Sequence, residues 1–227
     1  MQFVIPAPPQ VSLEVMGEDG RFPVRRIYCV GRNYVEHVRE MGADEREPPF
    51  FFQKPADAVL PSGSDFPYPR RTRNLHHEIE LVVAIGTAGQ DIAAGDALGH
   101  VYGYAVGIDF TRRDLQGDAK EMRRPWEAGK AFDHAAPCSP VRKASEIGHP
   151  DKGRIWLSVN GEVRQDGDLD QQIWSVPETI AQLSGLFALA PGDLLFTGTP
   201  AGVGAVEAGD RIKGGIEGIG EIEIKVS

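Results

Sequence analysis

Two glutamates, Glu78 and Glu80, lie two residues apart in the run His76–Gly86, whose second half is apolar. The run predicts a β-strand, in which side chains two apart leave the same face about 7 Å from each other. Because Val82 and Ala84 continue this face, the strand is expected to be buried on both sides. Neighbouring buried carboxylates repel unless a cation lies between them, and their oxygens prefer hard ions such as Mg²⁺ or Ca²⁺. The pair therefore indicates a metal site.

Glutamate alternating with isoleucine is also typical of a half-exposed strand. The chain contains such a case at Glu221–Val226, where Lys225 lies in line with two glutamates and a solvated face without function is expected. The pair at Glu78 and Glu80 differs because it continues into valine and alanine and not into lysine. The pattern alone leaves both interpretations open.

A third oxygen ligand is suggested by Asp109, close to the end of a second apolar run, Gly103–Phe110. Aspartate is disfavoured inside strands, so its presence calls for a reason. Ala105 and Gly107 share its face, and their small size leaves room for another group to approach. The alternative is a strand end at which Asp109 caps the following segment.

The elements expected to position these residues begin with a short strand at Arg25–Val30. Asn33–Gly42 then predicts a helix, on which His37 and Glu40 are neighbours because they lie three residues apart. Residues 42–65 are rich in acidic residues and proline. They predict a loop with one packed segment, and such a loop could act as a lid.

Further along, Asp114–Met122 predicts a helix, and Asn160-Gly161 between β-prone runs predicts a hairpin. Ser175 and Glu178 form a capping box that opens a helix with a core-facing stripe. The segment Leu194–Gly204 combines an apolar strand with a glycine-rich turn. It lacks the lysine and the following helix of a nucleotide-binding loop, so a tight turn is expected there.

Length and charge limit the classes of function. The chain has 227 residues, of which 41% are hydrophobic, and can bury one substantial core. Its formal net charge of -9 and its isoelectric point near 5.2 argue against nucleic acid or an anionic membrane as a partner. The composition favours a small molecule as the ligand.

Cysteine content and the lack of targeting signals bear on location. Cys29 and Cys138 lie in apolar surroundings, which indicates neither a disulfide framework nor a cysteine-based zinc site. The first residues lack the features of a signal peptide, and no stretch approaches the length of a membrane span. A cytoplasmic protein is expected.

Six motifs follow one another along the chain: Gly31-Arg32-Asn33-Tyr34, the His37/Glu40 helix, Phe52-Gln53-Lys54-Pro55, His76-His77-Glu78-Ile79-Glu80-Leu81, Asp109-Phe110-Thr111-Arg112-Arg113-Asp114-Leu115-Gln116 and Phe196-Thr197-Gly198-Thr199-Pro200. Their order resembles that seen in the fumarylacetoacetate hydrolase family. The resemblance runs from about Arg25 to the C-terminus, and the chain is similar to the single-domain fumarylpyruvate hydrolases and acylpyruvases of that family.

The resemblance implies an α+β, β-rich fold of mixed β-sheets rolled around a central site. Residues 1–24 are then an N-terminal segment and residues 25–227 the catalytic domain, in a protein expected to be a homodimer. Mg²⁺, or alternatively Mn²⁺ or Ca²⁺, is expected to be held by Glu78, Glu80 and Asp109. His76 shares their face, but the family's metal does not depend on a matching histidine, so His76 is expected to be structural or to support the ligands.

The resemblance also implies the catalytic groups. His37 would deprotonate a water molecule while Glu40 orients its imidazole. The remaining groups are Lys130 and Gln116, which would stabilise developing negative charge, and Arg113 and Thr199, which would hold carboxylate and keto oxygens of the substrate. Spacing alone favours simpler interpretations: an exposed helix residue for His37, ordinary surface residues for Lys130, Gln116 and Arg113, and a turn residue for Thr199.

The implied reaction is metal-dependent hydrolysis of a carbon–carbon bond in an acylpyruvate. The favoured substrate is 3-fumarylpyruvate, which gives fumarate and pyruvate in gentisate-type aromatic catabolism. The alternatives are an oxaloacetate decarboxylase, a broad acylpyruvase, or an isomerase and decarboxylase of a longer dicarboxylic keto acid. A non-catalytic metal-binding or metabolite-binding module is disfavoured because His37, Glu40 and Lys130 are all present.

Overall fold

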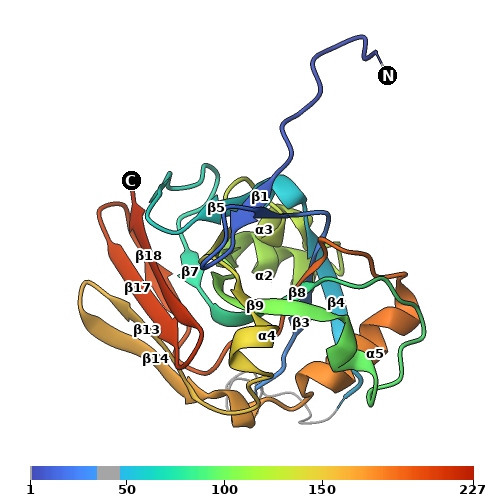
Figure 1. Ribbon diagram of the computed structural model, residues 1–227. Helices are drawn as coiled ribbons and strands as arrows, with labels where there is room; N and C mark the ends of the chain where they lie inside the picture. The colour runs from blue at the N-terminus through green and yellow to red at the C-terminus, as the bar shows by residue number, and fades with distance from the viewer. Residues whose placement is uncertain (1, 35–46) are drawn as a thin grey trace.

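The structure is a computed structural model that describes residues 2–34 and 47–227. β-strands dominate it and the helices are short (Figure 1). The described helices are η1 (Ala56–Ala58), η2 (Ala97–His100), α2 (Arg113–Glu121), α3 (Glu127–Lys130), α4 (Ala144–Ile147), η3 (Leu169–Gln171) and α5 (Val176–Leu186). The first residues run away from the body as an extended segment (Figure 1). The expected β-rich α+β class is confirmed.

The strands form one large sheet and three smaller ones. The eight-stranded sheet has the order β4 (Phe50–Lys54), β3 (Ile27–Gly31), β15 (Leu194–Phe196), β8 (Ile79–Ile85), β9 (Val101–Ile108), β11 (Ala136–Cys138) and β5 (Val59–Pro61), with β12 (Arg142–Lys143) also paired to β9. The five-stranded sheet has the order β14 (Glu162–Asp168), β13 (Arg154–Val159), β17 (Arg211–Ile216), β18 (Gly220–Val226) and β6 (Asp65–Phe66). The smaller sheets are β10 (Thr111–Arg112), β7 (Leu75–His77) and β16 (Gly204–Val206), and the pair β1 (Ser12–Glu14) and β2 (Arg21–Pro23).

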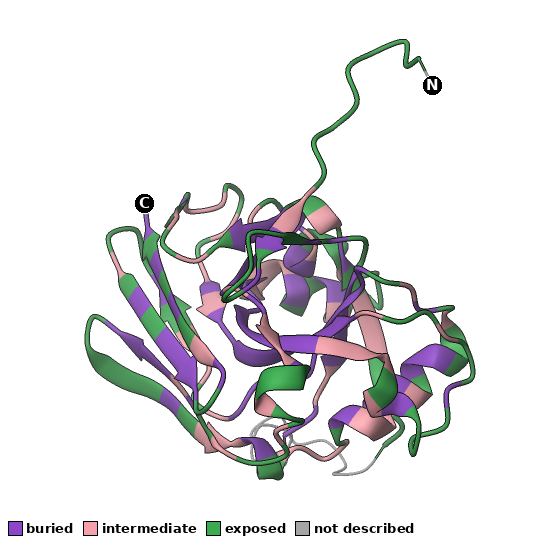
Figure 2. Cartoon of the chain, in the orientation of Figure 1, coloured by how far each residue is buried: buried purple, intermediate pink, exposed green. Residues whose placement is uncertain are grey.

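The large sheets are mixed and pack against each other. β15 pairs parallel with β3 and antiparallel with β8, so distant parts of the chain lie side by side. The five-stranded sheet approaches the large one closely, since a Cβ on Gly214 of β17 would lie 2.3 Å from Ile79 Cδ1 of β8. Figure 2 shows buried residues running along the inner strands and alternating with exposed ones on β17 and β18. The core therefore lies between the sheets.

Several local predictions are confirmed. Asn160 and Gly161 both have positive φ, at 53° and 85°, and they join β13 to β14 as a hairpin. A capping box between Ser175 and Glu178 opens α5, in which the Ser175 N–H donates to the Glu178 carboxylate at 3.0 Å. The glutamates of β18 are exposed and its isoleucines buried, as expected for a solvated face.

Two expectations need correction, and a third concerns residues outside the described ones. One packed segment was expected in the loop at residues 42–65, and β4 is that segment, since it pairs antiparallel with β3 because its aromatic run fits a sheet edge. The correction is that η1 and β5 follow it where loop was expected. The strand expected at His76–Gly86 is broken at Glu78, where the chain passes from the sheet of β7 to that of β8. Most of the helix expected at Asn33–Gly42, with His37 and Glu40, lies among residues 35–46, outside the described residues.

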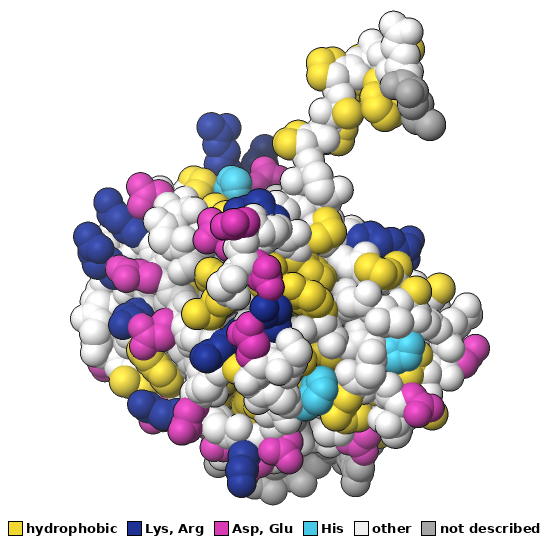
Figure 3. Space-filling view, viewed as in Figure 1, with side chains coloured by type: hydrophobic (Ala, Val, Ile, Leu, Met, Phe, Trp, Pro, Cys, Tyr) yellow, Lys and Arg dark blue, Asp and Glu magenta, His cyan; other side chains and the backbone are white. Residues whose placement is uncertain are grey.

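The composition and surface agree with the limits set by the sequence. On the face shown in Figure 3, basic and acidic side chains are interspersed and form no large patch of one sign. Both cysteines are buried and unpaired. None of the helices in the described part of the chain is long and apolar enough to cross a membrane.

Candidate functional site

Three buried carboxylates meet near the end of β9. Ligand oxygens of Glu78, Glu80 and Asp109 lie within 4.8 Å of one another, and the residues are 5%, 2% and 1% exposed. Glu80 belongs to β8, Glu78 lies in the break before it, and Asp109 follows the last residue of β9. The Asp109 N–H donates to the Glu78 carbonyl at 2.8 Å, which holds the two backbones side by side. The structure thus brings together the three residues expected to bind a metal.

The sequence predicts that the small residue Gly107 leaves room for another group to approach Asp109, and the structure shows a different reason for this glycine. Gly107 lies opposite Glu80 in the antiparallel pair of β8 and β9. A Cβ on Gly107 would lie 2.5 Å from Val82 Cγ2 and 2.6 Å from Phe196 Cε1. The glycine is therefore required for close packing of core side chains, and it does not open an approach path for a ligand.

Two buried lysines neutralise part of the carboxylate charge. The Lys130 ammonium lies 2.7 Å from Glu78 Oε2 and 2.6 Å from Asp109 Oδ2. Burial alone would lower the pKa of Lys130, but the Asp109 and Glu78 carboxylates raise it above its ordinary value. Lys54 Nζ lies 2.8 Å from Asp109 Oδ1 and also contacts the carbonyl oxygens of Phe110 and Lys130. Lys130 is therefore charged, and the contacts of both lysines hold them in place.

Lys54 belongs to the Phe52–Pro55 motif, but the sequence alone predicts no role for it. It is 2% exposed and ends β4, whose earlier residues are partly exposed. A lysine at the end of an aromatic strand was the available signal. Its contact with Asp109 could not be inferred from the sequence because 54 residues lie between the two.

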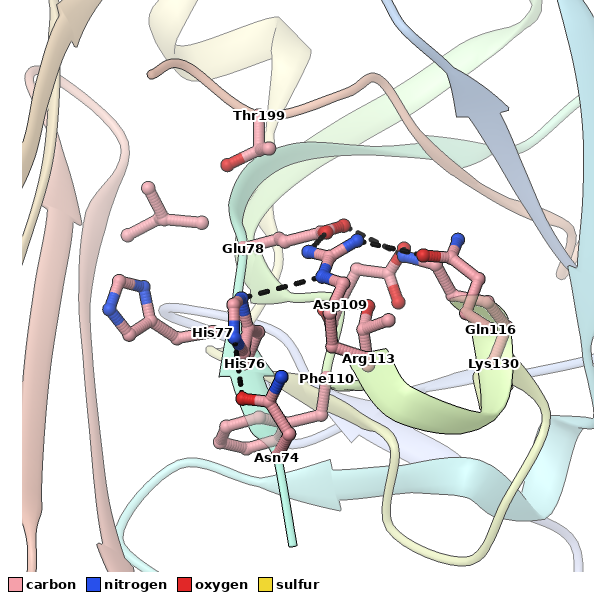
Figure 4. Close-up of polar contacts among 12 residues, drawn as sticks. Asn74, His76, His77, Glu78, Asp109, Phe110, Arg113, Gln116, Lys130 and Thr199 are labelled. Atoms are coloured by element: carbon pink, nitrogen blue, oxygen red, sulfur yellow. Dashed lines mark hydrogen bonds and ion pairs between the residues drawn. The ribbon is translucent and has the colours of Figure 1, made fainter. Parts of the chain in front are cut away.

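Helix α2 presents Arg113 and Gln116 to the carboxylates (Figure 4). The Arg113 guanidinium contacts Glu78 Oε1, donates to Gln116 Oε1 at 2.8 Å and donates to His76 Nδ1 at 3.4 Å. On its other side His76 Nε2 lies 2.8 Å from Asn74 Oδ1. Burial and the Arg113 guanidinium lower the pKa of His76 to about 4. A neutral His76 therefore helps to hold Arg113, as expected of a residue that is no metal ligand.

The carboxylates fit a hard divalent ion. Burial, then the neighbouring Asp109 and Glu78 carboxylates, raises the pKa of Glu80 well above its ordinary value. Its Oε2 accepts from the Gly198 N–H at 2.6 Å. Asp109 Oδ1 is buried and, among the described residues, receives no well-directed hydrogen bond, which leaves a lone pair for an ion. Three oxygen donors with open positions suit Mg²⁺, Mn²⁺ or Ca²⁺.

The loop after β15 holds Thr199 through a residue that sequence reasoning missed. Gln165 is fully buried, and its Nε2 donates to Thr199 Oγ1 at 2.7 Å and to the Pro200 carbonyl at 2.9 Å. Its Oε1 accepts from the Ile79 N–H at 3.1 Å and lies 2.9 Å from His77 Nδ1. The orientation of the Gln165 amide is thereby fixed. A glutamine in the otherwise exposed β14 was the only signal in the sequence.

These groups line one pocket, which encloses about 410 Å³ of space when its part open to solvent is included. The predicted residues that line it are Glu78, Glu80, Asp109, Arg113, Gln116, Lys130 and Thr199. Arg32, Lys120, Phe50 and Trp126 line it as well and were not predicted. His37 and Glu40 lie outside the described residues. The pocket thus offers a carboxylate cluster, several cations and an aromatic wall.

Comparisons with known proteins agree with this geometry. The family model described as "Fumarylacetoacetate (FAA) hydrolase C-terminal" matches residues 26–227. A crystal structure of fumarylpyruvate hydrolase from Pseudomonas aeruginosa, in complex with Mn2+ and pyruvate, is 58% identical with a TM-score of 0.97, over 99% of each chain. Fumarylpyruvate hydrolase from a Ralstonia species is 46% identical over 79% of this chain and 93% of its own. Human mitochondrial oxaloacetate tautomerase FAHD1 is 42% identical over 89% of this chain and 91% of its own.

Proposed function

Since this chain belongs to the fumarylacetoacetate hydrolase family, we propose that it is a metal-dependent hydrolase of acylpyruvates that converts 3-fumarylpyruvate to fumarate and pyruvate. The observation that carries the proposal is the buried cluster of Glu78, Glu80 and Asp109, which opens into a pocket lined by cations. The likeness to fumarylpyruvate hydrolase from Pseudomonas aeruginosa supports the choice of substrate.

Mg²⁺ is the proposed ion, held by the three carboxylates. When bound, a divalent ion would act as a Lewis acid on the 2-oxo acid end of the substrate and would stabilise negative charge that develops there. The Mn2+ and pyruvate in the Pseudomonas aeruginosa structure support an ion of this class. Mn²⁺ and Ca²⁺ have the same preference for oxygen ligands and remain alternatives.

Cleavage requires a base at the acyl end of the substrate. Water adds to the carbonyl carbon of the acyl group, and the bond from that carbon to the adjacent methylene then breaks. The acyl group leaves as a carboxylic acid and the bonding electrons pass to pyruvate as its enolate, which takes up a proton on carbon. By the family resemblance, His37 accepts the proton of the water and Glu40 orients its imidazole.

The enolate end requires positive charge and hydrogen-bond donors. Lys130 supplies a buried ammonium beside two of the carboxylates, and low-dielectric surroundings strengthen its attraction for a developing oxyanion. Gln116 has its carbonyl oxygen occupied by Arg113, so its amide nitrogen faces other partners. Arg113 and Thr199 complete the proposed set of substrate contacts, in the same pocket.

Oxaloacetate is the substrate of the second candidate function. Relatives named oxaloacetate tautomerase are 41–42% identical to this chain over 89% of its length. Tautomerisation moves a proton between carbon and oxygen and needs no attacking water. Tautomerisation would use the same metal ion and Lys130, but it would not need His37 to deprotonate a water molecule.

Steady-state turnover on fumarylpyruvate, acetylpyruvate and oxaloacetate tests the proposal, with Mg²⁺ and after chelation. We expect metal-dependent release of fumarate with the highest kcat/KM of the three. Glu80→Gln should abolish it by removing one ligand, whereas Glu223→Gln, in the exposed alternation of β18, should have no effect. Activity on oxaloacetate alone would overturn the proposed substrate, and unchanged activity after chelation would overturn the metal.

A further inference from the structure

Arg32 lies in the pocket in a backbone conformation that arginine rarely adopts. Its φ is +62°, in the left-handed region. Both neighbours hold it there. The Gly31 backbone lies so close to the Phe50 ring that a Cβ would be 2.1 Å from Phe50 Cζ, and the Asn33 side chain donates to the carbonyls of Trp174 and Thr197. The direction of the Arg32 side chain is therefore built into the fold.

The Arg32 guanidinium lacks a partner in the part of the chain that the structure describes. Its Nε is buried without a hydrogen bond, and its Cζ lies 5.9 Å from the centroid of the Phe50 ring. An arginine has five N–H donors, and a buried unsatisfied donor is costly. An anion in the pocket would satisfy it.

Lys120 is a second cation on the same wall. It lines the pocket, is partly buried, and its Nζ lies 4.9 Å from the centroid of the Trp126 ring. Burial and then the charges of Arg113, Arg32 and Lys130 lower its pKa, so these cations are close enough to repel one another. No carboxylate among the described residues forms an ion pair with it. Lys120 is thus also available to an anion.

The other cations near the carboxylates are already paired. Arg113 contacts Glu78, Lys130 contacts Glu78 and Asp109, and Lys54 contacts Asp109. These three cations balance the three carboxylates, and Arg32 and Lys120 are in excess even before a divalent ion binds. Among the described residues that line it, the pocket therefore has a surplus of positive charge suited to a ligand with more than one negative group.

The two excess cations share one aromatic pair. Arg113 opens α2 and Lys120 lies in its last turn, about 10 Å further along the helix axis at 1.5 Å per residue. Arg32 and Lys120 each contact one ring of the pair Phe50 and Trp126, which meet edge to face with centroids 5.4 Å apart. Two cations on one aromatic pair form a candidate anion site on this wall of the pocket.

We propose that Arg32 and Lys120 form a subsite for the second carboxylate of a dicarboxylic 2-oxo acid, with Phe50 and Trp126 beside the carbon chain. The 2-oxo acid end lies at the carboxylate cluster and the distal carboxylate lies between the two cations. This assignment rests on the proposed function for its reaction, but its charge recognition is independent of turnover. It makes Arg32 and Lys120 determinants of substrate specificity.

A matched pair of ligands that need not react tests the subsite. 2-Oxopimelate and 2-oxoheptanoate share the 2-oxo acid end and differ only in the distal carboxylate, and calorimetry on the Mn²⁺-loaded protein gives both affinities. We expect 2-oxopimelate to bind roughly 10- to 100-fold more tightly, because hydrogen bonds to a charged group strengthen binding by about this factor. Arg32→Met and Lys120→Met should each lower this preference about tenfold or abolish it, and neither should change the affinity for Mn²⁺.

A matched control and a second variant keep the result decisive. Arg124→Met removes an exposed cation just after α2 and should leave the preference intact. Should Arg32→Met fail to fold because of its strained position, Lys120→Met on α2 gives the answer alone. No preference in the unaltered protein, or a preference that Lys120→Met leaves unchanged, would overturn the assignment.

Turnover separates this inference from the proposed function. Fumarylpyruvate carries the distal carboxylate and acetylpyruvate does not, so Lys120→Met should lower kcat/KM for the first about tenfold and spare the second. A protein that prefers 2-oxopimelate but hydrolyses neither substrate would refute the function and keep the subsite. Hydrolysis of both substrates with equal losses in the variant would refute the subsite and keep the function.

Discussion

Replacing Lys54 with methionine should destabilise the metal-free protein while strengthening its affinity for a divalent ion. The Lys54 ammonium lies 2.8 Å from Asp109 Oδ1, 3.2 Å from the Phe110 carbonyl, and in contact with the Lys130 carbonyl. Methionine keeps most of the volume of the side chain and removes the charge. The loss therefore falls on three acceptors that are all buried.

The magnitude follows from these contacts. Removing one partner of a buried ion pair costs about 3 to 5 kcal/mol when the other charge is left unpaired. Asp109 keeps Lys130 at 2.6 Å, so the lower end, about 3 kcal/mol, is expected. For a chain of 227 residues, each kcal/mol shifts Tm by about 2 to 4 °C, so the metal-free variant should melt roughly 6 to 12 °C below the parent. In the metal-loaded protein, Asp109 has the ion as a partner, and the loss should be much smaller.

Thermodynamic linkage then fixes the sign of the effect on metal affinity. If the ion recovers stability that the variant has lost, the variant must bind the ion more tightly by the same free energy. Recovery of about 1.4 kcal/mol corresponds to a tenfold lower Kd. The physical reason is that Lys54 and the ion compete for the same carboxylate.

Thermal melts with chelator and with excess Mn²⁺, together with calorimetric Mn²⁺ titration, measure both quantities. Lys225→Met is the control, since Lys225 is an exposed lysine on β18, and it should change neither Tm nor Kd. Equal destabilisation with and without Mn²⁺, or weaker Mn²⁺ binding by the Lys54 variant, would refute this account of the charge balance.

Three further predictions concern the same site. Gly198→Ala should destabilise the protein by about 1 to 3 kcal/mol in thermal melts, because φ is +93° and a Cβ would lie 2.8 Å from Asn33 Cβ; an unchanged Tm would contradict this. Gln165→Glu replaces the N–H that Thr199 accepts with an acceptor, so the Thr199 hydroxyl should turn toward it and pyruvate affinity should fall about tenfold, while Gln171→Glu at the surface should not lower it. Since the pKa of Glu80 is raised, a proton competes with the metal, and Kd for Mn²⁺ should weaken by up to about tenfold per unit as pH falls through that pKa; a pH-independent Kd would count against Glu80 as a ligand.

The assembly and the domain boundary remain predictions from the resemblance. A homodimer should appear in light scattering at twice the chain mass of 24.7 kDa, and a monomer would contradict it. Deletion of residues 1–24 tests the boundary at Arg25. The deletion removes β1 and β2, so a loss of folding would show that this hairpin belongs to the catalytic unit.

The sequence by itself determined features that depend on a few neighbouring residues. The hairpin at Asn160-Gly161 follows from two residues that accept positive φ, and the start of α5 follows from the capping box of Ser175 and Glu178. The carboxylate pair was found from its alternation, although only Glu80 lies in the strand, β8, which is buried on both faces. The family resemblance added the residues expected around it.

Only the tertiary structure decided which distant groups share the site. β15 lies between β3 and β8, which is a choice of strand partner that no local pattern contains. Lys54 and Lys130 come from separate elements and meet at Asp109, and Gln165 reaches Thr199 from another sheet. Such contacts depend on sheet register and on the packing of one sheet against another. Many residues set these together, so their positions follow from the folded chain as a whole.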